Sequence, residues 1–115
     1  MQHQPNLITS TVFHILLALR SDELHGYEII KQIERDTDGN VRLLTGTLYG
    51  ALKRLETEGL LAEAEGRPAA DQDDERRRYY QLTVAGRAAL GAELERYATA
   101  LKLAQQANIM PARHA

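Results

Sequence analysis

Hydrophobic residues recur at helical spacing in three segments of the first half of the chain. The first segment can be capped by Thr9, Ser10 or Thr11, and it is apolar on almost every side until about Arg20. The second begins at His25 and has an isoleucine-rich side opposite a charged side. The third runs from Thr45 to Leu61 and places leucines at steps of four and three. These patterns predict three packed helices, the first of them largely buried.

Alternation with a period of two follows the third helix and predicts strands. Residues Leu60 to Glu65 form one alternating segment, Arg77 to Thr83 form a second, and the polar residues 66–75 between them predict a long hairpin tip. A short apolar run from Val41 to Leu44 is long enough for one further stubby strand. Three helices followed by a two-stranded hairpin with a basic end predict a winged helix-turn-helix.

The last predicted helix is capped by Thr83, runs to Met110 and is stopped by Pro111. At 1.5 Å per residue it would be about 40 Å long, more than a core of this size can cover. We therefore expect it to pair with the same helix of a second copy, although it could instead fold back on its own domain. The predicted dimerisation residues form a heptad seam: Leu90, Leu94, Tyr97, Leu101 and Ala104.

The predicted fold class is mainly α with a small β-hairpin, a winged helix-turn-helix domain plus a long C-terminal dimerisation helix. In residue numbers, 7–83 form the winged helix, 84–110 form the dimerisation helix, and 1–6 and 111–115 are flexible ends.

Composition narrows the class of protein. The formal net charge of −2 argues against a protein that coats nucleic acid without specificity. Any contact with nucleic acid must therefore be confined to a local basic surface. There is no cysteine, which excludes disulfides and thiol chemistry, and no apolar run is long enough to span a bilayer. No signal peptide is visible at the start, so we expect a cytoplasmic protein.

The third predicted helix carries the most informative polar face. Opposite its leucines lie hydroxyls, a phenol and two cations, with no acid before Glu56 and with Gly59 where a left-handed residue would end the helix. Such a face can meet phosphates and base edges in a DNA major groove, although an ordinary solvated helix face would look similar. The candidate DNA-binding residues of this helix are Thr45, Thr47, Tyr49, Gly50, Lys53 and Arg54.

Basic residues also end the predicted hairpin tip. Arg76, Arg77 and Arg78 are consecutive, and because neighbours in a strand point to opposite faces, at most two of them can reach one DNA backbone. Arg77 is the stronger candidate, since Arg78 shares its face with the core residues Tyr80 and Leu82. No histidine has a partner at metal-ligand spacing and no catalytic arrangement is visible, so we expect no metal, no cofactor and no enzyme.

Three motifs, in this order, resemble those of the PadR family of bacterial transcriptional regulators: HGYEIIKQIE from His25, GTLYGALKRLETEGLL from Gly46, and DERRRYYQLTVAG from Asp74. The resemblance implies a homodimeric repressor that binds an inverted-repeat operator and releases it on a signal, such as a small-molecule effector. It also implies that the GTLY helix enters the major groove. The matching DNA-binding positions are Thr47, Tyr49, Lys53 and Arg54, Arg76 to Arg78, and Tyr27 with His25 near the DNA backbone.

The chain departs from the family pattern around the GTLY motif. Leu44, Thr45 and Gly50 stand where the family usually has serine, proline and proline. Because leucine cannot cap a helix, we expect Thr45 to be the N-cap and the helix to start one residue later. Gly50 weakens the helix by about 1 kcal/mol relative to alanine, yet it opens space beside the DNA.

Two questions stay open on the sequence. The chain could be a winged-helix protein-interaction module without specific DNA binding, although such a module need not keep cations on both the third helix and the wing. An effector, if one exists, could occupy a cavity at the dimer centre; the alternative is a plain packed interface. The candidate lining residues are Leu94, Tyr97, Leu101, Phe13 and Leu16.

Overall fold

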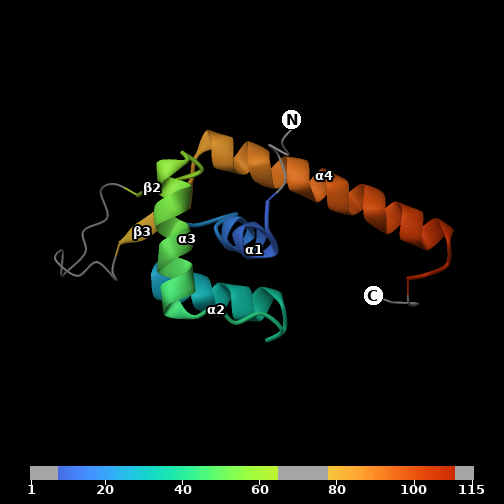
Figure 1. Cartoon of the computed structure of the whole chain (residues 1–115), viewed down its shortest axis with the longest axis horizontal. Helices are drawn as coiled ribbons and strands as arrows, with labels where there is room; N and C mark the ends of the chain where they lie inside the picture. Colours follow the sequence, from blue (N-terminus) through green and yellow to red (C-terminus); the bar gives the residue numbers. More distant parts are fainter. Residues whose placement is uncertain (1–7, 65–77, 111–115) are drawn as a thin grey trace.

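The computed structural model describes residues 8–64 and 78–110 (Figure 1). It is mainly helical with a small antiparallel sheet, and it has the predicted winged-helix order. The elements are α1 (Ser10–Ala18), β1 (Leu24–His25), α2 (Gly26–Asp36), α3 (Thr45–Thr57), β2 (Leu61–Glu63), β3 (Tyr79–Leu82) and α4 (Val84–Gln106). Both strands of the predicted hairpin are present but shorter than their alternating segments.

The sheet contains a third strand that the sequence analysis placed wrongly. The strand order is β1-β3-β2, with Leu24 opposite Tyr80 on one side of β3 and Leu61 opposite Leu82 on the other. The run from Val41 to Leu44, predicted as a strand, pairs with nothing in the sheet. The apolar character of this run has another cause, because Val41 and Leu43 pack against the core without strand pairing, while Arg42 and Leu44 are exposed.

Helix α1 lies at the centre of the domain, between α2 and α4, and α3 stands beside them at the end of the molecule that carries β2 and β3 (Figure 1). This arrangement explains why α1 is apolar on nearly every side: both flanking helices cover it. The largest fully buried side chains come from four elements: Ile15, Leu16, Ile29, Ile33, Leu48, Leu52, Leu55 and Leu61.

Side-chain caps fix where three of the helices begin. Thr9 caps α1 by accepting the N–H of Val12 at 3.2 Å. His25 caps α2 in a reciprocal pair with Glu28, whose carboxylate accepts the His25 N–H at 3.1 Å. Thr83 caps α4, as predicted, by accepting the N–H of Gly86 at 2.9 Å.

The turn after α3 connects to the base of α4 through the same threonine. Gly59 has a φ of +82°, the left-handed conformation that the sequence predicted for the end of this helix. The Thr83 hydroxyl donates to the carbonyl of Gly59 at 2.7 Å, so one side chain both caps α4 and binds the end of α3.

Helix α4 ends four residues earlier than predicted, at Gln106 rather than Met110. Asn108 adopts a φ of +59°, and the N–H of Ile109 donates to the carbonyl of Ala104 at 2.9 Å. Asparagine tolerates the left-handed conformation better than most residues, so it ends the helix before Pro111 can.

Gly86 and Gly91 provide a matched test of packing in α4. A Cβ on Gly86 would overlap the carbonyl oxygen of Leu60, whereas a Cβ on Gly91 would meet nothing within 4 Å. We expect Gly86→Ala to lower the free energy of unfolding by about 2 kcal/mol, because backbone must move. Gly91→Ala should raise it by about 0.5–1 kcal/mol, because alanine favours the helix. Urea unfolding followed by circular dichroism measures both; equal effects would contradict this packing.

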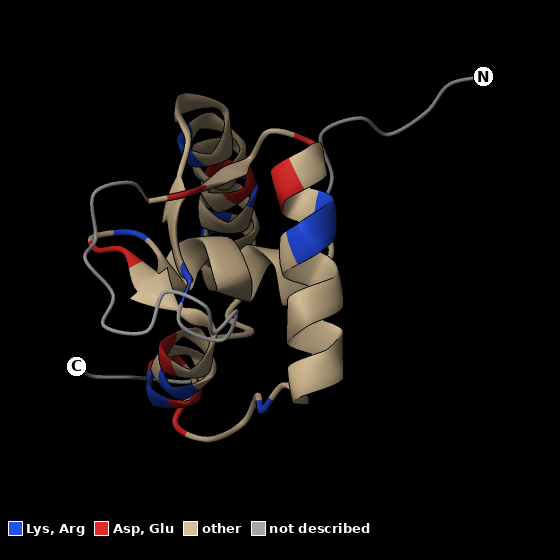
Figure 2. Cartoon of the chain, turned by 90° about the vertical axis from the view of Figure 1, so that its left-hand side faces the viewer, with Lys and Arg blue, Asp and Glu red and all other residues tan. Residues whose placement is uncertain are grey.

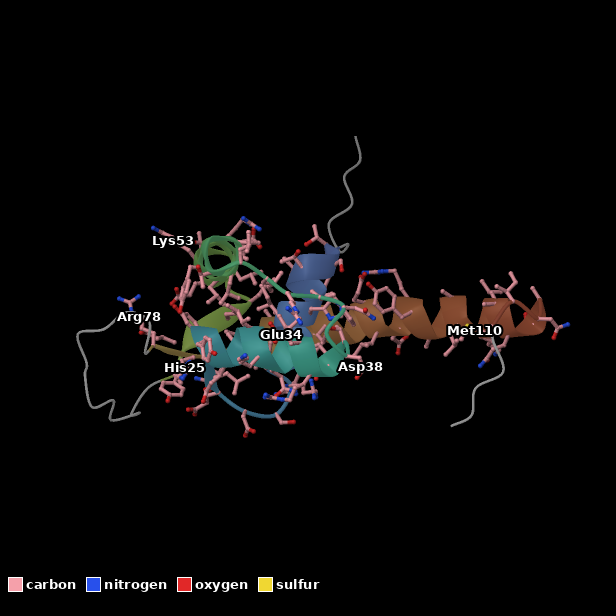
Figure 3. All side chains as sticks on the ribbon, turned by 90° about the horizontal axis from the view of Figure 1, so that it is seen from below. His25, Glu34, Asp38, Lys53, Arg78 and Met110 are labelled. Atoms are coloured by element: carbon pink, nitrogen blue, oxygen red, sulfur yellow. The ribbon has the colours of Figure 1, made fainter. Side chains whose placement is uncertain are left out.

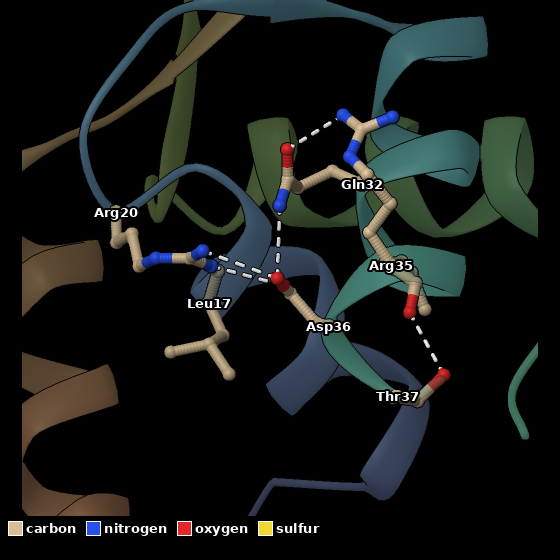
Figure 4. Close-up of polar contacts among 7 residues, drawn as sticks. Leu17, Arg20, Gln32, Arg35, Asp36 and Thr37 are labelled. Atoms are coloured by element: carbon tan, nitrogen blue, oxygen red, sulfur yellow. Dashed lines mark hydrogen bonds and ion pairs between the residues drawn. The ribbon is translucent and has the colours of Figure 1, made fainter. Parts of the chain in front are cut away.

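A polar network joins the C-terminal ends of α1 and α2 (Figure 4). The Arg20 guanidinium donates to both carboxylate oxygens of Asp36, at 2.9 and 3.1 Å, and Gln32 donates to the same carboxylate at 2.8 Å. Burial acts to raise the pKa of Asp36, but the hydrogen bonds from Arg20 and Gln32 and the Arg20 charge outweigh it and lower that pKa. The carboxylate therefore stays ionised and holds the two helix ends together.

This network makes part of the stability depend on pH. Because the pKa of Asp36 is lower in the folded chain, its contribution is present above the unfolded value of about 4 and is lost as the pH falls through the folded value. We expect Arg20→Gln to cost about 1 kcal/mol at neutral pH, a modest value because Arg20 is partly exposed. In urea unfolding, that difference should shrink steadily below pH ~4. A difference independent of pH would mean that the ion pair does not stabilise the fold.

Candidate nucleic-acid interface

The outward face of α3 is set by burial of its other side. Leu48, Leu52 and Leu55 are in the core, and Ala51 lies beside them. Because helical residues three and four apart share a face, the remaining positions must point away from the domain. The exposed residues of α3 as far as Arg54 are Thr45, Gly46, Thr47, Gly50, Lys53 and Arg54. All of the predicted candidates of this helix except Tyr49 are therefore exposed.

Charge changes along α3 in a definite order (Figure 2). The first eight residues, Thr45 to Leu52, carry no charge, Lys53 and Arg54 follow, and an acidic residue, Glu56, comes only in the last turn. The positive end of a helix dipole and exposed hydroxyls thus lie at the start of the helix, with two cations in the next turns. Such an order suits a polyanion approaching the N-terminal two-thirds of α3.

The start of α3 differs from the prediction. The helix begins at Thr45 and its N-cap is Leu44, which makes no side-chain capping bond. Thr45 is therefore the first helical residue rather than the cap, and its hydroxyl is not used to satisfy the first N–H groups. Burial of Leu48 fixes the helical register here, so the chain enters the helix at leucine despite its poor capping chemistry.

Tyr49 is half-buried and joins α3 to α2. Its ring lies directly over Gly26, where any Cβ would overlap the phenol oxygen. The glycine in HGY and the tyrosine in GTLY are both visible in the motifs, but their spacing along the chain does not predict this contact. Tyr49 therefore has a packing role, and its contact with DNA stays a prediction.

The start of α2 presents His25 and Tyr27. The ring of His25 packs edge-on against Tyr79 with centroids 5.3 Å apart, while its Nδ1 accepts the N–H of Glu28. Tyr27 is exposed, and the Lys31 ammonium lies 5.4 Å from its ring centroid. The Tyr27 phenol in the first turn and the Lys31 ammonium one turn later can bind phosphate oxygens, whereas the His25 Nδ1 is already occupied by the cap.

The basic wing residues are only partly described. Arg78 is exposed and its Nε lies 3.2 Å from the Glu63 carboxylate across the hairpin, so its charge is partly balanced. Arg76 and Arg77 lie outside the described residues. Figure 3 shows Arg78, Lys53 and His25 at one end of the molecule and Met110 at the other.

The predicted heptad seam of α4 divides between the domain and solvent. Leu90 is buried in the core of its own chain, whereas Leu94, Tyr97 and Leu101 are exposed by 40%, 43% and 43%. Tyr97 also packs edge-on against Phe13 of α1, with ring centroids 4.8 Å apart. Ala104 is half-buried. The seam therefore begins as core and becomes an uncovered apolar stripe as α4 leaves the domain.

Two details of this region bear on a ligand cavity. Leu16, a candidate lining residue, is fully buried inside its own chain and cannot line a cavity between two copies. Glu93 is buried on α4 and its carboxylate binds the Arg96 guanidinium, with the Nε contact at 3.1 Å.

Of the described side chains, no group of three His, Cys, Asp or Glu is placed to hold a metal ion. None of the described helices is long and apolar enough to cross a membrane.

Comparison with known proteins supplies the family. The pattern described as "Transcriptional regulator PadR-like family" matches residues 15–92, which run from the last residues of α1 through β3 into the first part of α4. The chain belongs to the PadR family of transcriptional regulators. A transcriptional regulator of Mycobacterium tuberculosis is 42% identical over 77 residues, 67% of this chain and 65% of the relative, so the match spans less than two thirds of that protein.

Solved structures share the PadR-type architecture. A transcriptional regulator from Clostridium thermocellum superposes with a TM-score of 0.64 at 29% identity, over 87% of this chain and 97% of that one. PadR of Bacillus subtilis, solved in complex with operator DNA, superposes with a TM-score of 0.63 at 23% identity, over 76% of this chain and 48% of that one. The predicted family and winged-helix fold are confirmed, and the family and these relatives are regulators rather than enzymes.

Proposed function

We propose that this PadR-family chain is a homodimeric repressor that binds an inverted-repeat operator through α3. The observation that carries the proposal is the outward face of α3, which presents hydroxyls, then two cations, at the end of the molecule farthest from the tip of α4. A recognition helix reads base edges through side chains near its N-terminus. That half of α3 is exposed here, with its leucines buried behind it.

The candidate residues divide by chemistry into two roles. Arg54 has a planar guanidinium that can bind a guanine at two points, which is worth about 1–3 kcal/mol of discrimination. Lys53 carries a point charge that suits phosphate, and Tyr27 can donate to the backbone from the start of α2. Arg76, Arg77 and Arg78 would follow the backbone beside the groove, as the family resemblance implies. Gly50 leaves open space for DNA, since a Cβ there would meet nothing within 4 Å.

The proposed dimer forms through α4, as a dimerisation helix separate from the winged helix. The exposed stripe of Leu94, Tyr97 and Leu101 continues the core seam of Leu90 into solvent. A second copy joined at this end would leave both α3 helices free on the outside of the pair. Operators of dimeric helix-turn-helix proteins repeat at about 34 Å, one turn of the duplex.

Relief by an effector completes the proposal. A small molecule or other signal that changes how the two α4 helices pack would change the separation of the two α3 helices. A mismatch with the spacing of the operator then weakens binding without altering any residue at the groove. The runner-up function is a protein-interaction module without specific DNA binding. That module would not need the exposed hydroxyls and cations that α3 presents.

The proposal predicts different effects for the two cations of α3. In anisotropy titrations with DNA from upstream of the gene, the chain should prefer that duplex to a scrambled one, and its affinity should fall with added salt. Arg54→Ala should reduce the preference, whereas Lys53→Ala should weaken both duplexes alike and reduce the salt slope by about one. Lys102→Ala, a matched loss of charge on α4, is the control. Wild-type protein with no preference for the upstream duplex would favour the interaction module.

The proposed dimer has its own test. Leu101→Glu places a charge in the exposed seam and should yield a species near the monomer mass of 12.9 kDa in equilibrium sedimentation. Thr99→Glu places the same charge on the opposite side of α4 and should leave the dimer intact. If Thr99→Glu dissociated the dimer and Leu101→Glu did not, the interface would lie on the side of α4 lined by Ala92, Thr99 and Leu103.

A further inference from the structure

Leu44 is an unusual residue for its place in the fold. The residue is 76% exposed although it carries a large aliphatic group, and it occupies the N-cap of α3. Serine, threonine, aspartate or asparagine at an N-cap would satisfy the first N–H groups of the helix, whereas leucine satisfies none. Leu44 therefore contributes neither to the core nor to the cap of the helix. A residue whose side chain is unfavourable at its position and stabilises neither the helix nor the core is a candidate for a functional role.

The surroundings of Leu44 leave it accessible to a large ligand. Thr45, Gly46 and Thr47 follow it and are all exposed, and a Cβ on Gly46 would meet nothing within 4 Å. No charged residue occurs among the first eight positions of α3. The start of the helix is thus an open surface, uncharged from Leu44 to Leu52, with one projecting aliphatic side chain.

The chemistry of leucine limits what it can recognise on DNA. It cannot donate or accept a hydrogen bond, so it cannot read phosphate oxygens or the polar edges of bases. The C5-methyl group of thymine is the apolar feature that base pairs present in the major groove. Residues near the N-terminus of a recognition helix are also the ones that reach base edges.

We propose that Leu44 is a specificity-determining residue that packs against a thymine methyl group in each half of the operator. The inference rests on the proposed DNA binding through α3 and adds a preference that hydrogen-bonding residues would not produce. It explains why an exposed leucine stands where capping chemistry favours a small polar residue.

The test uses duplexes that differ only in a methyl group. A randomised duplex library is selected for binding to the wild-type chain, and the enriched sequence is then synthesised with uracil in place of each thymine in turn. We expect uracil at one thymine per half-site to weaken binding about fourfold, the worth of one buried methyl group. The uracil penalty should vanish in Leu44→Ala, which keeps the helix uncapped and shortens the side chain to a methyl group that no longer reaches the thymine.

Two further variants separate the methyl contact from other effects. Leu44→Ser restores a capping hydroxyl, and it should also lose the uracil penalty even if the helix becomes more stable. Val84 is 89% exposed and lies next to Thr83, near the opposite end of α3; Val84→Ser removes its aliphatic side chain and should keep the full penalty.

The outcomes distinguish this inference from the function on which it rests. An enriched sequence whose binding ignores uracil, or a uracil penalty that persists in Leu44→Ala, would overturn the role of Leu44 and leave DNA recognition intact. Failure of the wild-type chain to enrich any sequence would overturn both.

Discussion

Burial of the leucine side of α3 is the interaction on which the rest of the molecule depends. Leu48, Leu52 and Leu55 are almost wholly removed from solvent, and each buried leucine is worth about 1.5–3 kcal/mol. Because a helix has a fixed periodicity, burying these three leaves no freedom in which residues face outward. The same contact therefore stabilises the domain and orients the hydroxyls and cations that make α3 a candidate recognition helix.

Features that depend on local chemistry could be predicted from the sequence. The start of the second helix at His25, the Thr83 cap, the left-handed Gly59 and the inward side of α3 all follow from short-range spacing. The third strand was predicted wrongly because strand pairing depends on which distant segment reaches the edge of the sheet. Leu24 and His25 form a strand because they pair with the edge of β3 that β2 leaves open. Val41 and Leu43 instead pack against the core without pairing with any strand of the sheet.

The candidate site shows the same division. Periodicity alone was enough to expect Thr47, Lys53 and Arg54 on the exposed side of α3. It could not reveal that Tyr49 packs over Gly26 or that Arg78 pairs with Glu63, because each contact joins residues from different elements. Leu44 is a third case: its exposure became visible only when the core fixed the register of the helix and left the cap without a polar group.

The hydroxyl of Thr83 donates to the carbonyl of Gly59, 24 positions earlier in the turn after α3, and accepts the N–H of Gly86 in the first turn of α4. Gly86 brings the same two segments into backbone contact, with no room for a side chain between them. The long helix is thus anchored like a lever at its base. Because the turn that ends α3 and the first turn of α4 share these contacts, a movement of the base of α4 would act directly on the C-terminal end of α3.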